Sequence, residues 1–388
     1  MTSASVRIRD TFSPADTGRL VLGWGTFLAT VVAGPWLEGP LPTPVLTGVL
    51  VVIVAVIVVC AFGVVAQAEH LAHRLGDPYG TLILTLSIVV IEVILISAVM
   101  LGPGDHTTIA RDSVMAVSMI ILNLVIGVAL IVGGLRHGGM LPNRTGTSAY
   151  LAVLVVLTTM ALVMPGLIGT DGTYTTAQEI PVIVFTVVLY IFFLYRQTGA
   201  QRDDFREVTP HDAARPAADD SPADSADATD IRAVIAGHRR EILGRSGILL
   251  LTVLPIVLLS HDMAALLDDG LARAGAPVAL SGVLIAMVVF LPETLTTVRA
   301  AHQGEIQRVS NLCHGALVST VGLTIPAVLT IGMVTGQRVE LFESPTNLVL
   351  LAVTLLLSVA TFTGRRVTAL HGAAHLMVFL VFGLSIFA

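Results

Sequence analysis

Eleven long apolar stretches divide this sequence, and they limit its fold more than any other feature. They lie near 20–36, 44–67, 79–101, 112–135, 148–168, 180–195, 246–267, 275–298, 309–334, 345–362 and 367–387. A helix needs roughly 20 predominantly apolar residues to cross a ~30 Å hydrocarbon layer. Turn-forming residues, such as those at 76–78 and 102–104, separate neighbouring stretches. The sequence therefore predicts an all-α polytopic membrane protein with about 11 transmembrane helices.

The composition excludes a soluble protein. Charged residues make up 12% of the chain and hydrophobic residues 54%, whereas globular proteins carry about 25% charged residues. Most of the surface must therefore face lipid. The net charge of −6 comes mainly from one acidic stretch, so no nucleic-acid partner is expected. The two cysteines, Cys60 and Cys313, lie in apolar runs, which excludes a disulfide framework.

The arginines predict the orientation of the chain. All 21 basic residues are Arg, and with the N-terminus inside, 18 fall in inner segments. Only Arg111, Arg273 and Arg338 fall outside. Because inner loops are enriched in basic residues, we expect a cell (inner) membrane protein with a cytoplasmic N-terminus and an external C-terminus.

These spans imply five regions along the chain. They are a cytoplasmic N-terminus (1–19), an extra first transmembrane helix (20–43), an N-terminal repeat of helices two to six (44–195), an acidic cytoplasmic linker (196–245) and a C-terminal repeat of helices seven to eleven (246–388). The first span resembles a signal peptide in length but lacks a clean cleavage site, so an uncleaved anchor is expected. The linker is rich in Asp, Ala, Pro and Ser, which predicts disorder; weak cation sensing by its acids is the alternative.

Two spans share one pattern. Glu92 in the third span and Glu293 in the eighth each follow a small residue by twelve positions. After each acid come a loop, an arginine (Arg111 or Arg308) and, about twelve residues later, polar side chains. The two units run in opposite directions across the membrane. This is a 5+5 inverted repeat, which is typical of secondary transporters with a midplane site.

Helical spacing groups further residues with these acids. Thr81 and Thr85 fall on the same stripe of the third span as Glu92. Pro292, directly before Glu293, opposes a regular helix and frees backbone carbonyls. The supporting polar or helix-breaking residues are therefore expected to be Thr81, Thr85, Asn123, Pro292, Ser319 and Thr320.

Buried acids of this kind indicate a cation and proton site. Intramembrane carboxylates are costly and usually functional, and their oxygens suit hard cations such as Ca²⁺. Two nearby carboxylates also bind protons when no cation is present. A divalent cation would then displace about two protons, which is sufficient for antiport. The alternative is a protonated or Arg-paired glutamate that only holds helices together.

At these residues the chain resembles the calcium/cation antiporter superfamily, specifically its bacterial Ca²⁺/H⁺ antiporter branch. The stretches that carry the resemblance are 68–92, 111–123, 291–293, 298–301, 310–312 and 322–326. The resemblance implies an exchanger of Ca²⁺ for H⁺ with Glu92 and Glu293 at the ion site. The wider family has Gly-Asn-x-x-Glu, whereas Val89-Val90-Ile91 and Phe290-Leu291-Pro292 precede the acids here. The missing Asn leaves fewer oxygen ligands.

Four other polar residues lie near span ends. Glu69 and His70, and His261 and Asp262, are roughly symmetric under the repeat and could line two vestibules; interfacial snorkelling is the alternative. On the last span, His371 and His375 are spaced i, i+4, but no third metal ligand is identified.

Rival functions remain open at this point. Na⁺/H⁺ or K⁺/H⁺ exchange would use the same acids, and a passive channel is a further alternative. A membrane-embedded enzyme would need a catalytic motif that the sequence lacks. No cofactor is expected, and the partners are the lipid bilayer, inorganic cations and protons.

Overall fold

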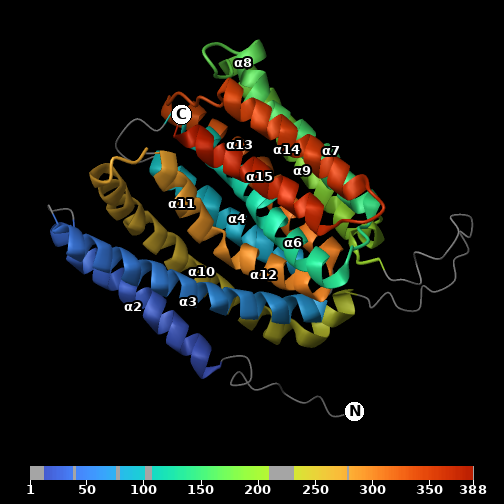
Figure 1. The fold of residues 1–388 in the computed structure, drawn as a ribbon, viewed down its shortest axis with the longest axis horizontal. Coiled ribbons are helices and arrows are strands. Elements are labelled where there is room, and N and C mark those ends of the chain that lie inside the picture. Colours follow the sequence, from blue (N-terminus) through green and yellow to red (C-terminus); the bar gives the residue numbers. More distant parts are fainter. Residues whose placement is uncertain are drawn as a thin grey trace, which may run out of the picture.

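The computed structural model describes residues 13–37, 41–75, 79–100, 107–208, 231–277 and 279–387. Its described part is helical (Figure 1). The elements are α2 (Pro14–Leu37), α3 (Thr43–Leu75), α4 (Tyr79–Met100), α5 (Ile109–Met119), η1 (Ile120–Val125), α6 (Ile126–His137), α7 (Arg144–Thr158), η2 (Thr159–Val163), α8 (Met164–Ile168), α9 (Thr176–Thr198), η3 (Arg202–Phe205), α10 (Ile231–Arg273), α11 (Ala279–Val289), α12 (Leu291–Gln303), α13 (Ile306–Thr335), α14 (Pro345–Thr363) and α15 (Ala369–Ile386).

Each of the eleven apolar stretches corresponds to a helix or to a run of consecutive helices. Within the described residues, nine helical segments are long and apolar enough to span a membrane. Two spans contain a π-helical turn, η1 or η2, between α-helices, and the eighth span is divided into α11 and α12. The prediction of an all-α polytopic membrane protein is confirmed.

The two halves have the same order of spans and pack in a reciprocal way. The third span, α4, lies along α13 of the second half, and the eighth span, as α12, lies against α6 of the first half. The second and seventh spans, α3 and α10, also pack together. These pairings are what a 5+5 inverted repeat requires, with α2 as an additional helix beside α3 and α10.

The buried side chains form two clusters. One lies mainly between α3 and α10, and α2 runs beside them along one edge of the molecule (Figure 1). The other lies mainly among α5 to α9 and α12 to α15. The packing of α4 on α13 and of α12 on both α3 and α13 joins the two parts.

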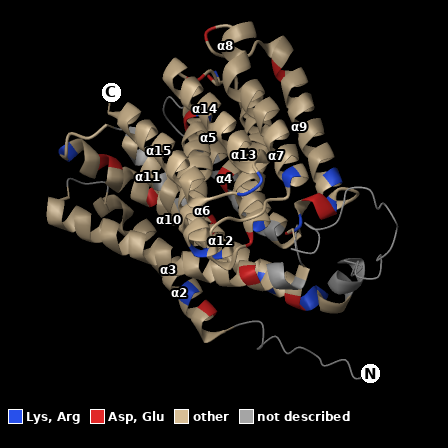
Figure 2. Cartoon of the chain, turned by 45° about the vertical axis from the view of Figure 1, so that its right-hand side comes forward, with Lys and Arg blue, Asp and Glu red and all other residues tan. Residues whose placement is uncertain are grey.

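Charged residues gather toward the ends of the helices, and the lengths between them are mostly uncharged (Figure 2). We call the end with the turns at 138–143 and 364–368 the linker end, because residues 199–208 lie there. The opposite end, with 107–108, 170–175 and 336–344, is the far end. This separation is what a bilayer demands, because charges are costly in hydrocarbon.

The acidic linker is shorter than predicted. Helix α9 continues to Thr198, residues 199–208 are packed on the bundle, and α10 already begins at Ile231. The prediction of disorder over the whole of 196–245 is therefore wrong at both ends. Its central part, 209–230, lies outside the described residues. Phe205 explains part of the difference, because its side chain is buried in an otherwise polar segment.

Candidate functional site

Glu92 and Glu293 lie inside the helical bundle, with 6% and 4% of their surfaces exposed. Glu92 is on α4 and Glu293 is in the first turn of α12. They lie close enough for their charges to interact. The fold therefore brings one carboxylate from each repeat into the same interior region, between α4, α12 and α13.

These carboxylates have few hydrogen-bond donors around them. The Thr320 hydroxyl donates to Glu92 Oε2 at 2.9 Å. In the described part of the chain, Glu92 Oε1 and both Glu293 oxygens have no hydrogen-bond partner. Buried carboxylate oxygens are normally satisfied, because an unpaired one costs free energy. Three oxygens without a partner among the described residues make this region the candidate functional site.

The break before Glu293 follows from its sequence. Helix α11 ends at Val289, Phe290 has φ −85° and ψ 9°, and Pro292 occupies the first turn of α12. Proline is well tolerated there because the first helical N–H groups have no intrahelical partner. Glu293 consequently lies at the N-terminus of a helix, where the backbone dipoles stabilise a negative charge.

The other predicted supporting residues divide into two groups. Thr85 is buried on α4, and its hydroxyl has no hydrogen-bond partner among the described residues; Thr320 contacts Glu92 directly. Ser319 instead accepts a hydrogen bond from Tyr190 at 3.1 Å. The side chain of Thr81 lies outside the described residues.

Asn123 differs from the expectation, because its side chain is committed to another network. Its amide nitrogen donates to Thr354 at 2.8 Å, and its oxygen lies 3.2 Å from His375 Nδ1. The Nε2 atom of His375 lies 3.2 Å from the Thr361 hydroxyl. Asn123 therefore ties η1 to α14 and α15. The sequence pattern placed it by its distance from Arg111, which says nothing about side-chain direction.

The predicted vestibule residues do not form one kind of site. Glu69 pairs with Arg299 at 2.8 Å, which joins α3 to α12, and His70 is exposed. His261 is 65% exposed and lies 3.7 Å from Asp262. Asp262 accepts a hydrogen bond from Thr30 of α2. This second pair therefore attaches the extra helix to α10.

His371 and His375 do not act together. His371 Nδ1 accepts from the backbone N–H of Thr368 at 3.1 Å at the start of α15, while His375 belongs to the Asn123 network. No cluster of three metal-ligating side chains is present among the described residues.

The sequence analysis did not single out two hydroxyls beside Glu293. Thr296 and Thr297 are both buried on α12, and Thr297 lies 3.9 Å from the Cys313 sulfur of α13. The signal was present in Pro292-Glu-Thr-Leu-Thr-Thr297, where polar residues continue for a turn after the acid. Unlike Thr81 and Thr85, which precede Glu92 on α4, these two threonines follow Glu293 on α12.

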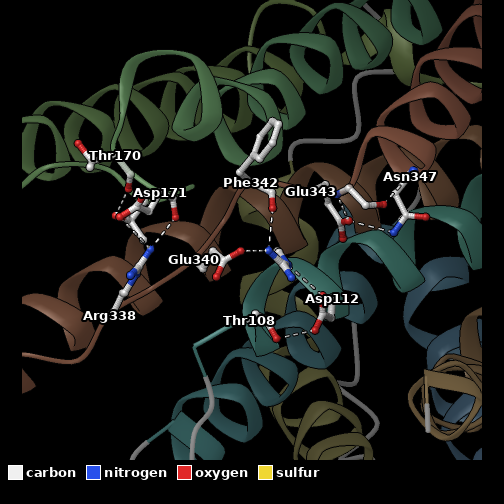
Figure 3. Close-up of polar contacts among 12 residues, drawn as sticks. Thr108, Asp112, Thr170, Asp171, Arg338, Glu340, Phe342, Glu343 and Asn347 are labelled. Carbon is white, nitrogen blue, oxygen red and sulfur yellow. Dashed lines mark hydrogen bonds and ion pairs between the residues drawn. The ribbon is translucent and has the colours of Figure 1, made fainter. Parts of the chain in front are cut away.

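Ionic contacts link the repeats at the far end. Arg111 of α5 donates to Glu340 and, at 2.8 Å, to the carbonyl of Phe342, both in the loop before α14 (Figure 3). Beside it, Glu343 accepts from the Asn347 side chain at 2.9 Å. Burial raises the pKa of Glu343. Arg111, a marker of the repeat in the sequence, thus joins the first half to the second.

Comparison with known proteins agrees with this architecture. The family model described as sodium/calcium exchanger protein matches residues 45–199 and 246–387. The putative ionic transporter y4hA of Sinorhizobium fredii (strain NBRC 101917 / NGR234) is 36% identical over 325 residues, 83% of each chain. The sodium-potassium/proton antiporter ChaA of Escherichia coli (strain K12) is 32% identical over 333 residues, 84% of this chain and 86% of ChaA.

The chain belongs to the sodium/calcium exchanger protein family. It is therefore a multi-pass membrane transporter of cations and not an enzyme, as the sequence predicted. The described residues that the family model matches include both repeats, whereas α2 and the stretch 200–245 lie outside the match.

Solved structures show the same fold. The H⁺/Ca²⁺ exchanger CAX has a TM-score of 0.61 at 13% identity, covering 96% of this chain and 89% of that one. Native YfkE has a TM-score of 0.57 at 15% identity, covering 95% and 99%. The sodium-calcium exchanger NCX_Mj has a TM-score of 0.54 at 10% identity, covering 94% and 99%. The predicted inverted-repeat fold is confirmed.

Proposed function

We propose that this family member is a secondary active antiporter that exchanges a metal cation for protons by alternating access. The observation that carries the proposal is the pair of buried acids, Glu92 and Glu293, one from each repeat. Three of their four carboxylate oxygens have no hydrogen-bond partner among the described residues. Unpaired carboxylates in a protein interior bind a cation or take up protons, since the bare charges are costly there. Cation and protons therefore compete for the same oxygens.

Competition of this kind is sufficient for exchange. If only a neutralised site crosses between the two orientations, each passage carries either the cation or the protons. Two carboxylates have a charge of −2, which one divalent cation or two protons neutralise. This charge balance, together with the hard oxygen ligands, favours Ca²⁺ as the cation.

Na⁺ or K⁺ is the second candidate. It is favoured by the 32% identity with the sodium-potassium/proton antiporter ChaA over most of both chains. Among the described residues, the site offers few side-chain oxygens beyond the two carboxylates and nearby threonines such as Thr320 and Thr85, because the Asn123 side chain is bonded elsewhere. Ca²⁺ prefers six to eight oxygen ligands, so water would have to complete its shell.

Transport in proteoliposomes tests the proposal. A pH dye trapped inside the vesicles reports proton movement when Ca²⁺, Na⁺, K⁺ or Mg²⁺ is added outside. We expect wild-type protein to give cation-dependent proton flux, with Ca²⁺ most effective. Flux with Na⁺ or K⁺ alone would select the second candidate.

Neutral variants identify the site in the same assay. Glu92→Gln and Glu293→Gln should each abolish the flux, since each removes half the charge of the site. Glu179→Gln is the matched control, because this partly exposed acid lies in the first turn of α9. Flux at the wild-type rate in either of the first two variants would contradict the assignment.

A further inference from the structure

The segment 199–208, at the start of the acidic linker, is built into the linker end of the bundle. Phe205 is 2% exposed and packs against the rings of Tyr150 and Phe193, at centroid distances of 5.1 and 6.0 Å. Burying a Phe side chain contributes roughly 1.5–3 kcal/mol. This segment is therefore held by an aromatic anchor that contacts α7 and α9.

Polar side chains of the bundle also bind the backbone of this segment. Asn311 of α13 donates its amide to the Phe205 carbonyl at 2.8 Å, in a buried position. Asn143, at the start of α7, donates to the Asp203 carbonyl at 3.3 Å. The same Asn143 accepts through its side chain from Gly146 and so caps α7. The segment thus contacts the ends of three spans.

Glu207 makes the most specific contact, because it caps α13 from outside that helix. Its carboxylate accepts from the backbone N–H groups of Ile306 and Gln307, at 3.0 and 2.8 Å. The residue at the N-cap position of α13, Glu305, makes no side-chain cap hydrogen bond of its own. Glu207 therefore supplies acceptors that the first turn of a helix normally finds locally.

We propose that 199–208 is a proton-sensitive latch on α13 and that Glu207 is its sensing group, a positioning residue for the transport site. Helix α13 carries Thr320, the donor to Glu92. From Ile306 to Thr320 the helix rises about 21 Å at roughly 1.5 Å per residue. The contact of Glu207 with the first turn of α13 therefore restrains the helix that carries Thr320.

The direction of the pH effect follows from the surroundings of Glu207. Burial raises the pKa of Glu207 to about 7, the nearby charge of Glu305 adds to the rise, and the backbone N–H groups partly offset it. Once released, the carboxyl returns to its ordinary pKa, about 4.3. The docked latch thus binds a proton more tightly than the released one. The docked state is therefore most stable in acid. Its stability falls as the pH rises from about 4.3 to about 7, and above about pH 7 it no longer changes with pH.

Other charged groups around the latch are mutually paired. Glu305 pairs with Arg308 at 2.9 Å on α13, and Asp203 pairs with Arg206 at 3.0 Å in the latch. The remaining charged or titratable side chains at this end of these elements and of the adjoining turns include Arg196, Arg202, Asp204, Arg136, Arg144, His137, His302, Arg365 and Arg366. The last two line one pocket with Val208, the residue after Glu207. Glu305 is the charged neighbour whose repulsion contributes to the raised pKa of Glu207.

The consequence for transport rests on the proposed function. With the latch docked, α13 is held at both its first turn and Asn311, and reorientation of the site is slowed. With the latch released, α13 is free to move. We therefore expect the maximal rate of cation-driven flux to rise as the pH at the linker end rises toward 7. Competition between protons and the cation at the site changes the KM but not the maximal rate, so the maximal rate reports the latch.

Hydrogen exchange of the full-length protein in detergent tests the latch without any transport. Protection of peptides covering 199–208 and the start of α13 is measured from pH 5 to 8.5 and corrected for the intrinsic exchange rate. In wild type we expect protection to fall about tenfold per pH unit between about pH 5 and 7, because one proton is involved. Above about pH 7.5 the protection should no longer change with pH.

Two variants make the test specific. Glu207→Gln keeps an acceptor but cannot ionise, so its protection should stay high and independent of pH. Its flux at pH 7.5 should fall to the wild-type value at acid pH. Glu305→Gln, a partly exposed neighbour, should keep the wild-type slope in hydrogen exchange.

The outcomes separate the two proposals. A flat wild-type protection profile, or a wild-type slope in Glu207→Gln, would overturn the latch whatever the protein transports. A normal latch profile with no cation-dependent flux in any variant would instead overturn the proposed function. If Glu207→Gln fails to fold, the wild-type exchange profile alone decides.

Discussion

At the scale of single residues, the proposed transport site is distinguished by carboxylate oxygens that have few hydrogen-bond donors. Glu92 has one hydroxyl donor and Glu293 has no hydrogen-bond partner among the described side chains. Both are nevertheless almost fully buried. A purely structural glutamate would be paired with a donor or an arginine, as Glu69 is with Arg299. The contrast between the paired Glu69 and the nearly unpaired Glu92 and Glu293 supports the proposal that the latter two bind the transported ions.

Thr320 provides a graded test of that site. Thr320→Val keeps the shape of the side chain but removes the hydroxyl that orients Glu92. A hydrogen bond of this kind contributes about 0.5–1.5 kcal/mol. We expect the KM for the transported cation to rise roughly two- to tenfold, with Thr320→Ser close to wild type. Initial rates of proton flux against cation concentration measure this.

The control for Thr320 lies on the same helix. Thr330 donates its hydroxyl to the Pro326 carbonyl of α13 itself, so Thr330→Val should leave the KM unchanged. An equal rise in KM in both variants would show that loss of any hydroxyl on α13 perturbs the site, and would argue against a specific role for Thr320.

At the scale of helices, the apolar stretches predicted every span but not their internal breaks. Hydrophobicity over about 20 residues indicates that a segment crosses the bilayer, and this signal is strong because lipid imposes it. The π-helical turns η1 and η2 carry no such signal, since neither contains a proline or a glycine to mark a break. Pro292 did reveal the break between α11 and α12, because proline has a definite backbone effect.

Close packing between helices depends on particular glycines. On α6, a Cβ added to Gly134 would clash with the backbone of Ala369 on α15. Gly134→Ala should therefore force α6 and α15 apart and destabilise the protein by about 1–3 kcal/mol. Gly383→Ala on α15 is the control, because nothing lies within 4 Å of the added carbon. Melting of the detergent-solubilised protein should show a lower midpoint for Gly134→Ala alone.

At the scale of the whole molecule, the inverted repeat explains why the acids meet. The reciprocal packing of α4 on α13 and of α12 on α6 places equivalent elements of the two halves around a shared interior. Sequence spacing predicted the two acids, since intramembrane carboxylates stand out. It could not predict the direction of the Asn123 side chain, which tertiary contacts with Thr354 and His375 decide.

The orientation of the molecule is testable as a whole. Arginine counts place the linker end in the cytoplasm, because basic loops remain inside. Native Cys60 and Cys313 are buried and should not react with a maleimide, so any labelling comes from the single added cysteine. In intact cells, Gln337→Cys at the far end should react with a membrane-impermeant maleimide, and Thr145→Cys at the linker end should not. The reverse pattern would invert the predicted topology.

The central claim is that a cation and protons compete for Glu92 and Glu293. The most direct measurement is proton release when cation is added to purified protein in weak buffer, without any transport. We expect Ca²⁺ to release about two protons per molecule near neutral pH, and Glu92→Gln or Glu293→Gln to abolish the release. Saturable cation binding with no proton release from wild type, or proton release from either variant equal to that from wild type, would contradict the account.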